Sequence, residues 1–131
     1  MATVTTSTTV AIAGGSSVTA TSPVFNAEAT GEVSIGLLAD DAVITAEIQP
    51  SAASQLYVLL ISSSYYGPEL TYVFSDGTTD SATTFTLDGP QLYSAGNLGA
   101  VGVTPTHIRF TMTSAGVPAT VKVFVARDAT P

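Results

Sequence analysis

Hydrophobic and polar residues alternate with a period of two along most of the chain. In the first segment Val4, Val10 and Ile12 share one parity with Thr6 and Thr8. The same alternation recurs in four later segments, at residues 33–37, 44–48, 108–112 and 121–125. A period of two places alternate side chains on opposite faces of an extended chain, so each segment predicts a half-buried β-strand.

Two further patterns add strands to this set. The run Leu56–Ile61 is apolar on both faces, which predicts a central strand. Tyr72 and Phe74 precede an Asp76–Gly77 pair, and another apolar alternation follows it, so the sequence predicts a hairpin there. Residues 18–25 add one more strand, for a total of about eight or nine.

Strands at this spacing, separated by Gly, Pro and Ser, predict an all-β fold. Helix-forming stretches are limited to single turns, at residues 50–55 and at Asp40–Asp41. We therefore expect one domain over residues 1–131, an antiparallel β-sandwich or jelly roll. The uncharged residues 1–13 predict an extended N-terminal arm that pairs with a neighbour's sheet edge; the alternative is an ordinary first strand of the same chain.

Composition excludes several classes of function. Charged residues make up 10% of the chain, with 3 basic against 10 acidic residues and a net charge of −7, which argues against nucleic acid as a partner. The absence of cysteine excludes disulfides, thiolate nucleophiles and zinc-thiolate or iron–sulfur centres. Neither a secretory signal nor a membrane-spanning segment is expected, so we expect synthesis in a cytoplasm and no contact with a membrane.

Two loop patterns invite a ligand interpretation. Gly96, Gly99 and Gly102 recur every third residue, but a phosphate-binding loop needs a helix to follow, so a plain loop is favoured. Asp76 and Asp80 bracket a short loop and Asp40–Asp41 stand together, yet calcium needs six to eight oxygen ligands. Turn formation by Asp–Gly is the favoured interpretation, and no metal or cofactor is expected.

His107 is the only histidine and hence the one candidate for a base that titrates near neutral pH. No Gly-x-Ser-x-Gly motif accompanies it, and no close pair of acids replaces it. We expect a structural histidine and a protein that is not an enzyme. A small hydrolase built on His107 and a nearby carboxylate is the alternative.

All three basic residues lie in the last quarter of the chain, whereas nine of the ten acids precede residue 89. If residues 107–112 and 121–125 form a terminal hairpin, His107, Arg109, Lys122 and Phe124 share its outer face. This face predicts a contact with an acidic partner or with an identical subunit. The alternative is pairing with carboxylates of the same domain.

Tyr65 and Tyr66 form the one aromatic pair in a predicted loop. Exposed tyrosine rings offer stacking faces with a polar tip, which suits a sugar or another small molecule. The alternative is a loop that packs on its own sheet or on a neighbouring chain.

A domain of this size has too few charged side chains to cover its surface. Apolar and hydroxyl-rich faces are expected where subunits pack together, so the composition predicts a homo-oligomer. The residues assigned to partner contacts are Val4, Val10, Ile12, Tyr65, Tyr66, Arg109, Lys122 and Phe124.

The closing segment, residues 106–125, resembles the terminal hairpin of small β-sandwich virion proteins of tailed bacteriophages, with a vaguer similarity over residues 33–61. The cysteine-free, acidic, Thr/Ala/Gly-rich composition also resembles capsid decoration (cement) proteins. That resemblance implies a homotrimer on the capsid surface, bound to the major capsid protein or another virion protein. The alternative is a carbohydrate- or receptor-binding module of a tail or fibre that uses Tyr65, Tyr66 and Tyr93.

Overall fold

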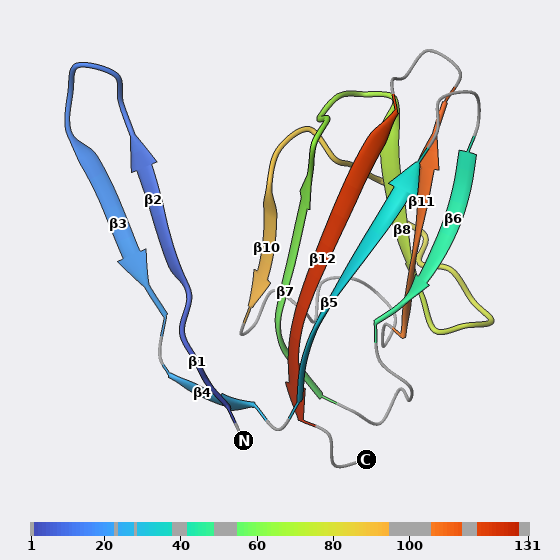
Figure 1. The fold of residues 1–131 in the computed structure, drawn as a ribbon, viewed down its shortest axis with the longest axis horizontal. Helices are drawn as coiled ribbons and strands as arrows, with labels where there is room; N and C mark the ends of the chain where they lie inside the picture. The colour runs from blue at the N-terminus through green and yellow to red at the C-terminus, as the bar shows by residue number, and fades with distance from the viewer. Residues whose placement is uncertain are drawn as a thin grey trace.

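The computed structural model describes residues 2–22, 24–27, 29–37, 42–48, 55–94, 106–113 and 118–128. All regular structure in these residues is β-strand (Figure 1). The twelve strands are β1 (Ala2–Val4), β2 (Ser7–Ala11), β3 (Ser17–Thr21), β4 (Phe25–Ala27), β5 (Ala29–Leu37), β6 (Ala42–Glu47), β7 (Gln55–Ser63), β8 (Leu70–Ser75), β9 (Phe85–Thr86), β10 (Gln91–Ser94), β11 (His107–Met112) and β12 (Ala119–Asp128).

Eight of the strands form two four-stranded antiparallel sheets, in the orders β10-β7-β12-β5 and β6-β11-β8-β9. The pairing is nested, since β5 pairs with β12, β6 with β11, β7 with β10 and β8 with β9. This is the arrangement of a long antiparallel ribbon rolled into two facing sheets, which defines a jelly roll. The predicted all-β sandwich is confirmed.

The core lies between the two sheets and is built by the predicted alternation. In β11 burial alternates strictly, with Ile108, Phe110 and Met112 fully buried. Val121 and Val123 of β12 are fully buried as well. The run Leu56–Ile61 falls in β7, which is an interior strand as predicted. Period-two patterning therefore identified the inward faces of β11 and β12.

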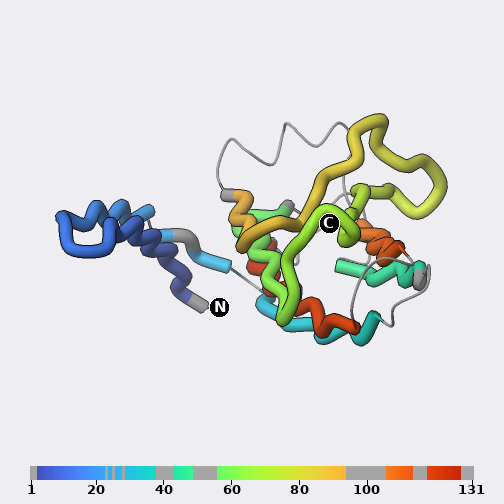
Figure 2. Tube along the Cα trace, turned by 90° about the horizontal axis from the view of Figure 1, so that it is seen from above, coloured from blue at the N-terminus to red at the C-terminus, as the bar shows by residue number. Residues whose placement is uncertain are grey.

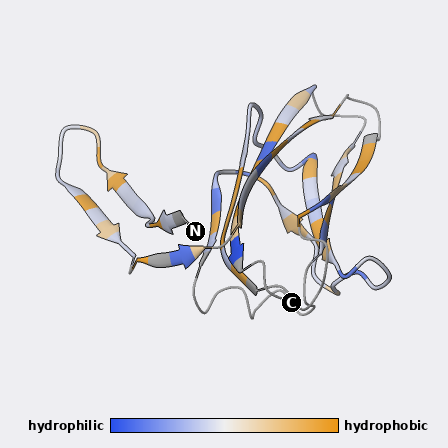
Figure 3. Cartoon of the chain, turned by 60° about the horizontal axis from the view of Figure 1, so that its bottom comes forward, coloured by the Kyte–Doolittle hydropathy of each residue, from blue (hydrophilic) through white to orange (hydrophobic). Residues whose placement is uncertain are grey.

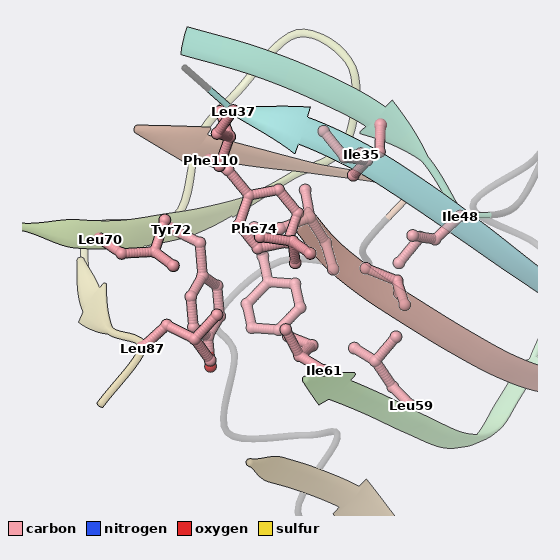
Figure 4. Close-up of a cluster of buried hydrophobic side chains, with 14 of the residues drawn as sticks. Ile35, Leu37, Ile48, Leu59, Ile61, Leu70, Tyr72, Phe74, Leu87 and Phe110 are labelled. Atoms are coloured by element: carbon pink, nitrogen blue, oxygen red, sulfur yellow. The ribbon is translucent and has the colours of Figure 1, made fainter. Parts of the chain in front are cut away.

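Aromatic rings fill one part of this core (Figure 4). Tyr72 contacts three rings, with centroid distances of 5.6 Å to Phe74, 5.3 Å to Phe85 and 5.8 Å to Phe110. The Phe74 ring also meets Tyr93 edge to face at 5.4 Å. Such offset and edge-to-face pairs add to the stabilisation from burial alone.

The other four strands form a hairpin arm outside the sandwich. Strand β1 pairs with β4, and β2 pairs with β3, so residues 2–27 run out and back as a two-stranded ribbon. Figures 1 and 2 show this ribbon standing away from the sandwich, with its base near the lower ends of β5 and β12. The N-terminal segment is thus one half of a hairpin, and the uncharged arm extends beyond residue 13.

The predicted hairpin at Asp76–Gly77 is confirmed by the pairing of β8 with β9. The Asp76 carboxylate accepts hydrogen bonds from the backbone N–H groups of Thr78 (2.9 Å) and Thr79 (2.6 Å). Gly77 has a φ of 95°, in the left-handed region that residues with a Cβ avoid. Asp76 thus acts in turn formation, the role favoured from the sequence.

We predict that Gly77→Ala lowers the free energy of unfolding by about 1–2 kcal/mol, because an alanine is strained at positive φ. A Cβ at this position meets the His107 ring at 3.5 Å, an ordinary contact, so the cost comes from the backbone. Gly36→Ala is the matched control, since nothing lies within 4 Å of its Cβ position. Urea unfolding curves measure both variants; equal effects would contradict the prediction.

The two hydrogen bonds to Asp76 hold the pKa of its carboxyl below the ordinary value. The carboxylate therefore stabilises the fold above the ordinary aspartate pKa of about 3.9, and this contribution is lost as pH falls through the folded-state pKa. We expect Asp76→Ala to melt at a lower temperature than the wild type at pH 7, with the gap closing near pH 2. Thermal melts at both pH values test this, and a gap independent of pH would refute it.

The predicted terminal hairpin is wrong. Strand β11 lies between β6 and β8 in one sheet, whereas β12 lies between β7 and β5 in the other. Both strands turn one apolar face to the same core. Alternation in the sequence predicts which face of a strand is apolar, but it does not predict which strand pairs with it. Consequently His107 and Arg109 lie on the opposite side of the sandwich from Lys122 and Phe124.

Candidate partner-binding surface

The base of the arm packs on the outer face of the β10-β7-β12-β5 sheet. Ala27 of β4, Val58 of β7 and Ala126 of β12 form a second buried cluster, separate from the main core. Val4 and Phe124 pack against it. Apolar residues on the outer side of this sheet thus fix the root of the arm.

A groove of about 720 Å³ separates the arm from the same sheet. Seven consecutive residues, 4–10, line its arm side, so it is the backbone edge of β2 that faces the sheet. The sheet side is formed by Val58, Leu60, Leu92 and Phe124, with Pro90 beside them. The groove therefore has an apolar floor and one wall made of strand edge.

The hairpin β2–β3 has two chemically different faces. On one face Val10 lies directly opposite Val18, and the two side chains are 64% and 69% exposed. On the other face the hydroxyls of Thr9 and Thr19 are hydrogen bonded at 2.9 Å. Figure 3 shows orange and pale segments along this hairpin, and residues 1–27 contain no charged residue.

This apolar face has nothing to pack on in the described part of the chain. Every residue of β2 and β3 is exposed, and Ile12, at the turn, is 67% exposed. An isolated two-stranded hairpin is only marginally stable in water, and packing on another surface stabilises it. The described residues of β2 and β3 therefore belong to neither of the two buried clusters.

Four of the eight residues assigned to partner contacts lie on the arm or its groove: Val4, Val10, Ile12 and Phe124. Lys122 is on the same outer face, in a shallow depression of about 280 Å³ that it shares with Ser62, Ser63, Ser64 and Thr120. The structure thus brings five of these residues to one side of the sandwich. Arg109, Tyr65 and Tyr66 lie elsewhere.

Arg109 lies on the other sheet and is paired within its own chain. Its Nη2 is 2.6 Å from Oδ2 of Asp80, and both side chains are partly exposed. Pairing with a carboxylate of the same domain was the alternative considered from the sequence, and the structure confirms it for Arg109. A partly exposed pair of this kind contributes little to stability.

His107 is half-buried beside this ion pair. Its Nδ1 is 2.7 Å from the Thr106 hydroxyl, and its Nε2 is 3.8 Å from Oε2 of Glu47. His107 lines a polar recess of about 330 Å³ together with Asp80 and Arg109, whereas Thr106 is buried and does not line it. The Thr106 hydroxyl therefore orients the imidazole instead of facing the recess.

Tyr65 and Tyr66 do not present free rings. Both pack against the main core. The Tyr65 hydroxyl donates a hydrogen bond of 2.5 Å to Oε2 of Glu69, which raises the tyrosine pKa and lowers the pKa of the carboxyl. The Tyr66 hydroxyl accepts a 3.1 Å bond from the backbone N–H of Ser63. The loop packs on its own sheet, the alternative to a stacking platform.

Tyr93, the third tyrosine of the sugar-binding alternative, is also held in the fold. The Tyr72 hydroxyl donates to Oε1 of Gln91, so the Tyr93 hydroxyl, 2.6 Å away, donates to Tyr72. Burial raises the Tyr72 pKa far above its ordinary value, and the bond to Tyr93 raises it further. This network ties β8 to β10 across the edge of the sandwich.

Sequence reasoning missed the floor of the groove. Leu60 and Leu92 were not singled out, although Leu60 belongs to the run that is apolar on both faces. That run was assigned to a central strand, and within this interior strand Leu60 is 36% exposed. The apolar residues on the outward face of β7 were the sequence signal for the arm and groove on the outer side of the sheet. Val18, which lies opposite Val10, was predicted to belong to an additional strand and was not assigned to partner contacts.

Several predicted features fall outside the described residues. These are the glycine-rich segment 96–102, Asp40–Asp41 and most of the predicted turn at 50–55. Within the described ranges, no group of three or more His, Asp or Glu side chains is placed to hold a metal ion. The same ranges contain no helix with the length and hydrophobicity that a membrane crossing requires.

The fold and this surface define a class, a jelly-roll domain with an uncharged hairpin arm. Comparisons with protein-family models, with curated proteins and with solved structures find no match for the chain.

Proposed function

We propose that this chain is a structural virion protein, a capsid decoration protein that binds the assembled head of a tailed bacteriophage and stabilises it. The observation that carries the proposal is the hairpin arm, which is uncharged and exposes an apolar face that no described residue covers. Such a face is expected on a protein that functions in an assembly. The main partner is the major capsid protein.

The fold supports this proposal by analogy. Eight-stranded jelly rolls occur in viral capsid proteins and in lectins. Fold alone does not define function, so the site has to decide between these classes. The three tyrosines of the sugar-binding alternative are half-buried and hydrogen bonded within the fold, whereas the arm is exposed. The exposed arm and the half-buried tyrosines therefore favour a function in assembly over carbohydrate binding.

The mechanism is thermodynamic linkage. A protein that binds the assembled shell and not its free subunits stabilises the shell by the free energy of binding at each site. No catalytic step is required, and the arm residues Val10, Ile12 and Val18 supply contact area. We infer a homotrimer as the binding unit, and analytical ultracentrifugation tests this against the 13.2 kDa of the monomer.

Quantitative mass spectrometry of purified virions tests the proposed function. A decoration protein is present in amounts comparable with the major capsid protein, because it occupies sites throughout the lattice. A tail or fibre module is present in only a few copies per particle. Absence from particles would rule out both virion functions, and a low copy number would favour the receptor-binding alternative.

A further inference from the structure

We propose that the groove between β2 and the β10-β7-β12-β5 sheet is a binding site for one extended, uncharged strand of the capsid protein. This inference rests on the proposed function and goes beyond it, because it names the site and the form of the partner segment. Two properties of the groove carry it: hydrogen-bonding capacity and charge.

The arm wall offers backbone hydrogen bonds. Strand β2 pairs only with β3 in the described chain, so its other edge is unpaired, and this edge lines the groove. An incoming strand can extend the β3–β2 ribbon by one strand, as in β-augmentation. Main-chain bonds of this kind provide affinity, and pockets for side chains provide specificity.

The lining selects an uncharged segment. Among the described residues that line the groove none is charged, and its floor consists of Val58, Leu60, Leu92 and Phe124. A charged side chain inserted here loses hydration and gains no counter-charge, which is costly. A capsid segment of Thr, Ser, Val or Ala carries no charged side chain and so needs no counter-charge in the groove.

A photo-crosslinking experiment in assembled particles tests the site. Leu60→p-benzoylphenylalanine places the probe in the floor, and Val43→p-benzoylphenylalanine, on the other sheet and 55% exposed, is the matched control. We expect the probe at position 60 to crosslink to one extended segment of the capsid protein, and the probe at position 43 not to reach that segment. A crosslink from position 60 to another copy of this chain, or none at all in particles that contain the protein, would overturn the inference.

Binding of purified protein to undecorated shells gives a second readout. Leu60→Gln is expected to bind at least tenfold more weakly than wild type, whereas Val43→Gln binds normally. Hydrogen exchange should show new protection of the β2 amides in the bound state, which a merely apolar contact would not produce. Equal binding by both variants, or unchanged exchange in β2, would refute strand addition. Absence of the protein from virions, in contrast, would refute the proposed function itself.

Discussion

Replacing Phe110 by alanine should lower the free energy of unfolding by about 3–5 kcal/mol, the range for removal of a buried aromatic ring. Phe110 is fully buried in the interior strand β11, where it lies opposite Ile44 on one side and Tyr72 on the other. The Tyr72 ring is 5.8 Å away, so the substitution opens a cavity and removes a ring contact. A loss of this size is a large part of the stability of a small domain.

Val43→Ala is the control for this experiment. Val43 lies on the outer face of β6, next to the same strand, and is 55% exposed. Its replacement should change the free energy of unfolding by no more than about 0.5 kcal/mol. Urea titration followed by circular dichroism measures both variants. Similar losses in the two would contradict the assignment of the core to the space between the sheets.

The double variant Val10→Ser/Val18→Ser should bind undecorated shells more than a hundredfold more weakly than wild type. Burial of each valine is worth about 1.5 kcal/mol, and a total near 3 kcal/mol corresponds to roughly two orders of magnitude in affinity. Thermal stability should change little, since both side chains are exposed in the free protein.

The opposite face of the same hairpin supplies the matched control. Thr19→Ala/Thr21→Ala changes two exposed residues of β3 on the face away from the valines and outside the lining of the groove, and we expect it to bind normally. Binding is measured by co-sedimentation with shells. Equal weakening by both double variants would show that the arm acts through its general shape, and equal binding by both would show that the arm is not the contact.

Alternation in the sequence was enough to predict the fold class and the inward faces of the strands. The residues Ile108, Phe110 and Met112 are buried as the pattern required. The pairing of strands was less predictable, because a period of two reports which face is apolar and not which strand lies alongside. That is why β11 and β12 were placed in one hairpin although they lie in different sheets.

Only part of the candidate surface could be predicted, because the sequence pattern does not show which strands lie next to each other. Val4 and Val10 were assigned to partner contacts as part of an uncharged arm, and Phe124 as part of a basic and aromatic outer face. All three line one groove. Their proximity could not be deduced, because it depends on the hairpin folding back over the outer side of a sheet. Leu60 and Leu92 join them only through the pairing of β7 with β10.

The stability of shells with and without the protein tests the central claim most directly. Undecorated shells are incubated with wild-type protein or with Val10→Ser/Val18→Ser, and their disruption on heating is followed by light scattering and electron microscopy. The proposed function predicts that wild-type protein raises the disruption temperature and that the double variant does not. Disruption at one temperature with and without bound wild-type protein would contradict it.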